Sequence, residues 1–307
     1  MVFSLVARGT ESRWDPILDW VRALWRSGHP VAAEGGGRRR RAVAAARANE
    51  PPPDAATLRQ WLYGAGCLHP GDAEYLVDLV KVFGLGPEMT MLEFGSGMGG
   101  SAAVIAQAFN TYIEGFESDP ELVRAANHFL PTTKSAKHVK IKHYDPEKFE
   151  VRSSFYYRCL AREATYRIAN KQHVFAMASQ GLRRLGHIIV TDFVRDEAVP
   201  AGPEFDDWAA LQPSKPQLWT ARQYIDCMQK LGYDVQATND ATADYRRLIL
   251  RSWREALERP EVRQLRGRRG MPLIDEAERA IRTLAALDSG ALRYFYLFAL
   301  NGGPKPS

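Results

Sequence analysis

The sequence predicts an α/β protein built on a doubly wound, mostly parallel sheet. The main observation is a buried strand at residues 91–94, which ends in a glycine-rich turn at residues 95–100 and opens directly into a small, apolar helix at residues 101–106. The second observation is that strand-like and helix-like segments alternate along the chain after this point. Such alternation is typical of consecutive βα units around a parallel sheet.

The glycine turn has the chemistry of a site where a ligand meets bare backbone. Gly95 and Gly97 permit positive φ angles and leave room for a ligand to approach the main chain. The helix that follows offers unpaired N–H groups to an electronegative edge of that ligand. Taken alone, the pattern also fits an ordinary loop between a strand and a helix.

The surroundings of the turn favour a nucleotide-like ligand. The next predicted strand, residues 111–117, ends in Glu117. Its distance from the turn is close to the gap of roughly 20 residues at which doubly wound nucleotide folds place the acid that holds ribose hydroxyls. A second acid, Glu93, lies in the end of the first strand, which is unusual for a dehydrogenase fingerprint. We therefore interpret the turn as part of a cofactor site.

The remaining elements are predicted from apolar periodicity and turn residues. Helices are expected at residues 120–129, 170–185, 219–231 and 246–265, and strands at residues 139–142, 154–160, 188–193, 233–238 and 292–300. The last strand is strongly aromatic and is predicted to be the antiparallel edge strand. The arginine-dense helix at 246–265 is either a solvated amphipathic cap or a basic wall that recognises an anionic substrate.

Composition limits the class of protein. At 307 residues and 45% hydrophobic, the chain can bury a full core and supports one domain with additional segments. The net charge of +5 is mild and indicates tolerance of anionic partners more than it identifies one. Cys67, Cys159 and Cys227 have neither disulfide nor zinc-site spacing, so no metal is expected. No apolar run reaches the roughly 18 residues of a membrane span, and residues 1–8 do not fit a signal peptide, so we expect a cytoplasmic protein.

Two segments precede the main domain. Residues 1–27 contain a predicted amphipathic helix at 12–26, whose apolar face carries Trp14 and Trp25. That face either packs on the chain's own domain or contacts a membrane surface or a protein partner. Residues 28–56 form a basic linker rich in glycine, alanine and proline. Its four arginines at 38–41 are more typical of a solvated charge run than of a contact with nucleic acid or anionic lipid, because no aromatic residues lie between them.

Three motifs give the chain a family resemblance. The first is an aromatic-Gly-x-Gly-x-Leu-x-Pro-Gly segment at residues 63–71, and the second is Glu-x-Gly-x-Gly-x-Gly at 93–99 with an acid at the next strand end. The third is Arg-Glu-Ala-x-x-Arg-Ile at 162–168. Over residues 58–302 the chain resembles class I S-adenosylmethionine-dependent methyltransferases, in particular the small-molecule and lipid enzymes of the phosphoethanolamine N-methyltransferase type and their bacterial relatives.

The resemblance implies a fold and a cofactor. The fold is a Rossmann-like sheet of seven strands, formed by a methyltransferase domain at residues 57–303 with helical cap segments at about 194–218 and 246–287. The cofactor is S-adenosyl-L-methionine. Its amino-acid part is expected against Gly95, Ser96 and Gly97, with Glu93 supporting the turn. The other expected contacts are Glu117 to the ribose, Ser118, Asp145 and Pro146 to the adenine, Leu68 and His69 over the methionine end, and Arg162 at the pocket floor.

The candidate catalytic residues depart in part from the family. His69 and Tyr63 are candidates for a general base by location, although a histidine in a loop is also commonly a capping or hydrogen-bonding residue. Arg167 stands where the family has a histidine that helps deprotonate the substrate, and an arginine cannot act as that base. We predict that Arg167 either binds an anionic acceptor or forms a structural salt bridge with Glu163.

These departures bear on the substrate. The family's phosphate-binding tyrosines after strand five are also missing, since Phe193 and Pro216 occupy two of their places. We therefore predict methyl transfer to a small-molecule or lipid-like acceptor other than phosphoethanolamine, with the acceptor atom undetermined. Nucleic acid is not expected, because the Asn/Asp-Pro-Pro-aromatic segment of nucleic-acid methyltransferases is absent. The alternative is a catalytically inactive protein that keeps the fold as a binding or regulatory module.

Overall fold

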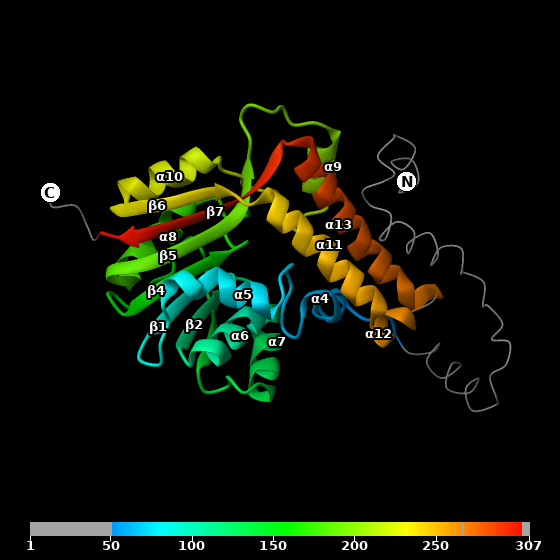
Figure 1. Cartoon of the computed structure of the whole chain (residues 1–307), viewed down its shortest axis with the longest axis horizontal. Coiled ribbons are helices and arrows are strands. Elements are labelled where there is room, and N and C mark those ends of the chain that lie inside the picture. The colour runs from blue at the N-terminus through cyan, green and yellow to red at the C-terminus, as the bar shows by residue number, and fades with distance from the viewer. Residues whose placement is uncertain (1–50, 266, 303–307) are drawn as a thin grey trace.

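A computed structural model describes residues 51–265 and 267–302 of the chain (Figure 1). The predicted helix at 12–26 and all but the last six residues of the predicted linker lie outside these ranges. The described part forms a sheet of seven strands in the order β3-β2-β1-β4-β5-β7-β6. The strands are β1 (Thr90–Phe94), β2 (Tyr112–Glu117), β3 (Val139–His143), β4 (Tyr156–Arg162), β5 (Leu182–Arg195), β6 (Tyr233–Asp240) and β7 (Leu292–Asn301).

Helices cover both faces of the sheet, which confirms the predicted doubly wound fold. One face packs against α5 (Ala73–Val80), α6 (Gly100–Phe109) and α7 (Pro120–Phe129), and the other packs against α8 (Lys171–Gly181) and α10 (Ala221–Lys230). Successive side chains of a strand point to opposite faces. Met91 of β1 accordingly lies in the core under α6, while Leu92 lies in the core under α8. None of the described helices combines the length and apolar character that crossing a membrane requires.

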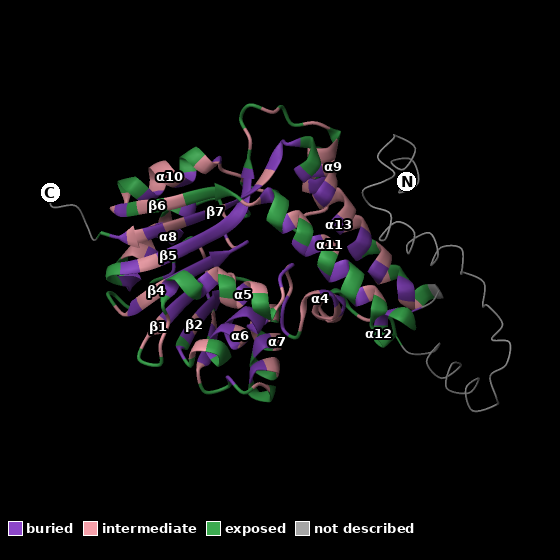
Figure 2. Cartoon of the chain, in the orientation of Figure 1, coloured by how far each residue is buried: buried purple, intermediate pink, exposed green. Residues whose placement is uncertain are grey.

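The antiparallel strand is not at the edge of the sheet. Strands β1 to β5 pair in parallel, and β7 pairs antiparallel with both β5 and β6. The prediction that residues 292–300 form an antiparallel strand is confirmed, but the edge position belongs to β6. Burial explains this order, since β7 is largely buried whereas β6 ends in exposed residues at Asn239 and Asp240 (Figure 2). Polar residues suit an edge, and aromatic residues suit the interior of a sheet.

A layer of helices lies beyond the end of the sheet and forms a cap. It consists of α4 (Ala55–Tyr63), α9 (Pro203–Ala210), α11 (Thr242–Glu258), the short α12 (Pro260–Arg263) and α13 (Met271–Ser289). Their apolar side chains share one core, in which Leu58, Trp208 and Trp253 are fully buried. The predicted cap segment at 194–218 contains α9, and the one at 246–287 corresponds to α11, α12 and α13. The part of the cap that the sequence did not predict is α4, which begins at Ala55 with Asp54 as its N-cap.

Two predicted helices end earlier than expected. The helix expected at 170–185 ends at Gly181, and strand β5 already begins at Leu182. The helix expected at 246–265 stops at Glu258. Pro260 explains the second difference, because a proline disfavours helical backbone in the residue before it. The chain then starts the separate turn of helix α12.

Asp192 of β5 fixes the loop that follows β4. One oxygen of its buried carboxylate, Oδ2, accepts hydrogen bonds from the Thr165 backbone N–H at 2.9 Å and the Thr165 hydroxyl at 2.6 Å. The Tyr224 hydroxyl donates to the same oxygen at 3.2 Å. The neighbouring Lys171 ammonium is buried and donates to the Ile168 carbonyl at 2.7 Å. This network holds residues 165–168, and with them the predicted site residue Arg167, against the end of the sheet.

Asp192 should make stability depend on pH. Burial raises the pKa of Asp192 from 3.8 to about 6. The folded state therefore binds this proton more tightly than the unfolded state. The stabilisation that protonated Asp192 gives the folded state is complete below pH 3.8 and is lost as pH rises through about 6. We expect Asp192→Asn to remove this dependence, worth roughly 3 kcal/mol of unfolding free energy. Urea unfolding at pH 4 and pH 7 measures the effect. The same change at exposed Asp206 is the control, and equal pH dependence in wild type and Asp192→Asn would contradict the prediction.

Candidate functional site

The turn between β1 and α6 has the predicted left-handed backbone. The φ angles are 69° at Gly95, 54° at Gly97 and 81° at Gly99, a region that favours glycine. The Gly95 N–H donates to the Phe116 carbonyl at 2.9 Å, which ties the turn to β2. The turn thus lies at the carboxyl end of the parallel strands, where open α/β sheets bind ligands.

Glu117 lies directly against this turn. Its Oε2 accepts the Gly97 backbone N–H at 2.8 Å, and its Oε1 accepts the Asp119 N–H at 2.9 Å. Ser118 lies next to it in the chain, and its hydroxyl is 3.4 Å from the same Oε1. The structure therefore brings together Gly97, Glu117 and Ser118, three of the residues proposed from the sequence as cofactor contacts.

Glu93 holds a buried carboxylate behind the turn. Its Oε1 accepts the Ser101 hydroxyl at 2.6 Å, while its backbone carbonyl accepts the Ser96 hydroxyl at 3.2 Å. Its Oε2 is buried and has no hydrogen-bond partner within residues 51–265 and 267–302. Burial raises the pKa of Glu93. A buried acceptor without a donor is costly, so this oxygen fits a ligand that brings an N–H group to the turn.

The loop of residues 64–71 is fastened over the turn by two glycines. The Gly100 N–H donates to the Gly66 carbonyl at 3.1 Å, and a Cβ atom on Gly100 would lie only 2.3 Å from the Gly66 carbonyl carbon. Leu68 reaches over the turn, since a Cβ on Gly97 would lie 3.2 Å from its Cδ1. Arg162 of β4 holds the other end of the loop by donating to the Pro70 carbonyl at 3.2 Å. The close backbone approach explains the glycine spacing in this segment.

Asp145 lies near the end of β2, and its carboxylate contacts two groups of its own loop. The Tyr144 N–H donates to the Glu117 carbonyl at 3.1 Å, which places the end of β3 beside Glu117. The Asp145 carboxylate accepts the Glu147 N–H at 3.1 Å and lies 3.1 Å from the Lys148 ammonium. Those two contacts lower the pKa of Asp145. Pro146 follows it and is half-buried.

His69 pairs with Glu163, a residue that was predicted only as a partner for Arg167. The His69 Nδ1 lies 3.0 Å from Glu163 Oε2, and the Tyr245 hydroxyl donates to the same oxygen at 2.8 Å. The Tyr294 hydroxyl lies 3.4 Å from Oε1. Burial alone would raise the pKa of Glu163, but His69, Arg162 and Tyr245 together lower it. Glu163 is therefore a buried anion held by groups from four different segments.

The predicted salt bridge between Arg167 and Glu163 is not formed. Glu163 is occupied by His69 and the two tyrosines, and the Arg167 guanidinium instead lies 5.3 Å from the centre of the Tyr166 ring. Within the described part of the chain Arg167 has no ion pair. The two side chains point in different directions. The backbone of Glu163, at φ 50°, turns its carboxylate towards the core, whereas Arg167 is exposed.

His69, Glu163 and Arg167 line a cavity of about 120 Å³ between the sheet and the cap. Tyr63, the other candidate for a general base, also lines this cavity, and burial raises the pKa of its hydroxyl. Aromatic and charged side chains make up part of the remaining walls, namely Tyr166, Phe193, Trp208, Arg59, Glu276 and Arg279. Trp208 is thus both a core residue of the cap and a wall of the cavity.

Sequence reasoning missed the cap residues of this site. Arg59 of α4 pairs with Glu276 of α13 at 3.0 Å, and Arg279 lies 3.8 Å from the same carboxylate. Tyr245 of α11 stacks on Tyr294 of β7, with ring centres 4.0 Å apart and an interplanar angle of 18°. The spacing of Tyr245, Ile249 and Trp253 could have marked one buried helix face. The spacing does not show what that face packs against.

Comparison with known proteins supports a common ancestry with methyltransferases. Residues 70–238, more than half of the chain, match the family described as methyltransferase domain. Phosphoethanolamine N-methyltransferase 2 of Caenorhabditis elegans is 22% identical over 193 residues, which are 62% of this chain and 43% of that protein. The enzyme of Plasmodium falciparum is 19% identical over 196 residues, 62% of this chain and 70% of that protein. The chain thus matches less than half of the length of the C. elegans relative.

Solved structures agree on the fold. Phosphoethanolamine N-methyltransferase 2 of Haemonchus contortus, in complex with S-adenosyl-L-methionine, superposes with a TM-score of 0.71 at 18% identity, covering 82% of this chain and 56% of that one. Geranyl diphosphate C-methyltransferase of Streptomyces coelicolor superposes with a TM-score of 0.58 at 17% identity, covering 75% of this chain and 76% of that one. The chain belongs to the methyltransferase-domain family.

Proposed function

We propose that this protein transfers the methyl group of S-adenosylmethionine to a small, anionic acceptor, with His69 as the general base. The observation that carries the proposal is the loop of residues 64–71. It places Leu68 over the glycine turn and His69 beside Glu163 at the cavity under the cap. One loop therefore joins a cofactor-type cradle to an acid–base pair.

The cradle fits the cofactor. The Gly95–Gly97 backbone with Ser96 would hold the amino-acid part of the cofactor. The Glu93 Oε2, which has no hydrogen-bond partner among the described residues, would accept a hydrogen bond from the cofactor's amino group. Glu117 would take the ribose hydroxyls, while Ser118, Asp145 and Pro146 lie on the adenine side, at the ends of β2 and β3. Arg162 secures the loop above. When bound, the cofactor supplies an electrophilic methyl group on sulfur.

His69 is better placed than Tyr63 to accept a proton. Glu163 orients the imidazole by accepting a hydrogen bond from Nδ1–H, which leaves the Nε2 lone pair free to accept a proton from the substrate in the cavity. Burial raises the pKa of Tyr63, so its phenolate does not form near neutral pH. The guanidinium of Arg167 cannot serve as a base. These residues would orient the acceptor and remove its proton, since in-line methyl displacement depends mainly on positioning.

Arg167 favours an anionic acceptor. It lines the cavity and carries no ion pair among the described residues, whereas Arg59 and Arg279 share the Glu276 carboxylate. Three arginines and two glutamates line the cavity, which leaves the space net positive. Tyr166, Phe193 and Trp208 form its apolar walls and would exclude water. The volume of about 120 Å³ suits a small molecule or the head of a lipid-like one.

The role of Glu117 can be tested by binding. We expect Glu117→Ala to weaken S-adenosylmethionine binding about tenfold to a hundredfold, as for the loss of hydrogen bonds to a charged group. Isothermal titration calorimetry measures the change, and Glu121→Ala, a nearby exposed acid in α7, is the control. Equal affinities for wild type and Glu117→Ala would refute the ribose assignment. Failure of the wild type to bind would favour the non-catalytic module.

The role of His69 can be tested by kinetics. Acceptors are first found by incubating the protein and labelled cofactor with fractionated metabolites. We expect His69→Gln to lower kcat about 10²-fold to 10⁴-fold, because a glutamine side chain cannot accept the proton of the substrate. Tyr63→Phe should change kcat far less. A large loss of kcat in Tyr63→Phe, with little change in His69→Gln, would reverse the two assignments.

Phosphoethanolamine provides a direct test of substrate choice. We expect no methylation of it by the wild type, because Arg167 and Phe193 replace groups that the resembling family uses for this substrate. Arg167→His should restore a base at that position, and Arg167→Gln is the control that removes the charge without adding an imidazole. Efficient turnover of phosphoethanolamine by the wild type, measured by labelled methyl incorporation, would show that this part of the proposal is wrong.

A further inference from the structure

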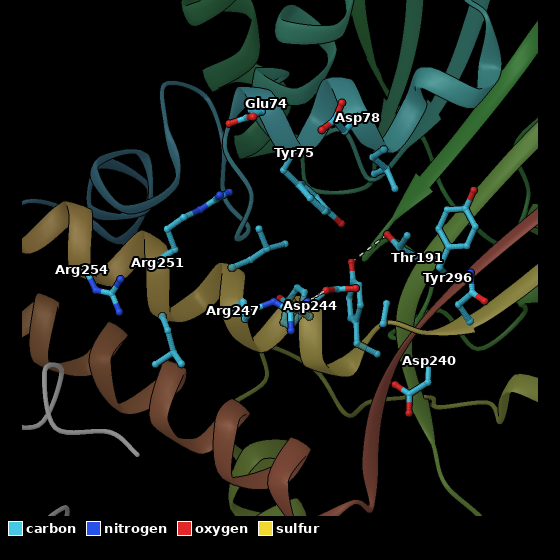
Figure 3. A pocket seen from close by; sticks show the side chains of 17 residues that line it. Glu74, Tyr75, Asp78, Thr191, Asp240, Asp244, Arg247, Arg251, Arg254 and Tyr296 are labelled. Atoms are coloured by element: carbon cyan, nitrogen blue, oxygen red, sulfur yellow. Dashed lines mark hydrogen bonds and ion pairs between the residues drawn. The ribbon is translucent and has the colours of Figure 1, made fainter. Parts of the chain in front are cut away.

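A second, larger cavity lies between α5 and α11. Its volume is about 820 Å³, and it rests on the sheet at β5, β7 and the end of β6 (Figure 3). The lining includes the apolar and aromatic side chains of Tyr75, Leu79, Tyr245, Leu248, Tyr294 and Tyr296, with the Thr191 hydroxyl among them. Cavities of this size and character are typical of small-molecule sites.

A wall of two tyrosines separates this cavity from the methyl-transfer site. The stacked rings of Tyr245 and Tyr294 face the larger cavity, while their hydroxyls reach Glu163, which lines the smaller one. The Tyr294 hydroxyl also lies 3.0 Å from Thr191 Oγ1. Of the described residues, Tyr245 alone lines both cavities. The larger cavity is therefore a separate site.

Charges of opposite sign line the two rims. Helix α5 presents Glu74 and Asp78, and helix α11 presents a row of arginines at 247, 251 and 254 (Figure 3). Two of these arginines are neutralised locally, because Arg247 pairs with Asp244 and Arg251 lies 2.7 Å from Asp72. Within residues 51–265 and 267–302, Arg254, Glu74 and Asp78 have no ion pair. A positive and a negative group thus remain available on opposite rims of an aromatic cavity.

We infer that this cavity binds a zwitterionic amphiphile with an apolar body. The cationic group would lie by Glu74 and Asp78, close to the tyrosine rings, whose faces attract cations. The anionic group would be bound by Arg254, which can donate two parallel hydrogen bonds. The apolar body would cover Leu79, Leu248 and Tyr296. A ligand with one sign of charge satisfies only one rim.

Four probes with the same octyl chain test the charge requirement. They are octyl sulfobetaine, octyltrimethylammonium, octyl sulfate and octyl glucoside, each titrated below its micelle concentration into the full chain by calorimetry. We expect the sulfobetaine to bind at least about tenfold more tightly than the other three. Equal affinities for all four probes would overturn the inference, because they would indicate apolar contact alone.

Variants locate the bound probe. Arg254→Glu and Glu74→Lys should each weaken sulfobetaine binding about tenfold, while Arg259→Glu, an exposed arginine just beyond the end of α11 that does not line the cavity, should leave it unchanged. Arg167→Gln should also have no effect. Loss of binding in Arg167→Gln would place the probe in the smaller cavity and overturn the inference. Binding of a peptide of residues 12–26, sensitive to Arg254→Glu, with no binding of the amphiphiles, would assign the cavity to a polypeptide instead.

Discussion

The buried charge of Glu163 organises this protein. A carboxylate taken from water must be matched by donors and opposite charge, or it destabilises the fold by several kcal/mol. Here the partners come from different parts of the chain: His69 from a loop, Arg162 from the same strand end, Tyr245 from the cap and Tyr294 from the last strand. Satisfying one carboxylate therefore fixes how the sheet, the loop and the cap meet.

Backbone strain at Glu163 fits this role. Its φ of 50° is uncommon for a residue with a side chain, and such strained positions tend to persist at functional sites because the surrounding contacts over-determine them. The strained backbone turns the carboxylate away from the exposed Arg167 and towards His69. Glu163 thereby orients the imidazole, and Arg167 is left for another partner.

The loop of residues 64–71 connects this charge to the cradle. Its closeness to α6 depends on Gly66 and Gly100, which touch backbone to backbone. Because Leu68 and His69 are adjacent in that loop, the position of the glycine turn sets the position of the imidazole. The two stacked tyrosines extend the same arrangement to the larger cavity, where they form the wall between the two cavities.

The sequence alone determined the parts of the site that depend on local backbone chemistry. A glycine turn with positive φ at Gly95 and Gly97 follows from the absence of a side chain, and Glu117 at the end of the next strand follows from strand length in a parallel sheet. The doubly wound fold likewise followed from alternating apolar segments. The three motifs at residues 63–71, 93–99 and 162–168 carried the family resemblance, and the match of residues 70–238 to the methyltransferase-domain family confirms it.

Only the tertiary structure decided which distant side chains meet. Tyr245 and Tyr294 lie 82 and 131 residues from Glu163 in sequence, and their local spacing does not predict that they contact it. The same holds for Arg59 and Glu276, which join α4 to α13 across 217 residues. The position of β7 inside the sheet was also decided by packing, because the polar end of β6 suits the edge better than the aromatic β7. Local periodicity predicts which face of an element is buried, whereas the identity of its partner depends on how all the buried faces pack at once.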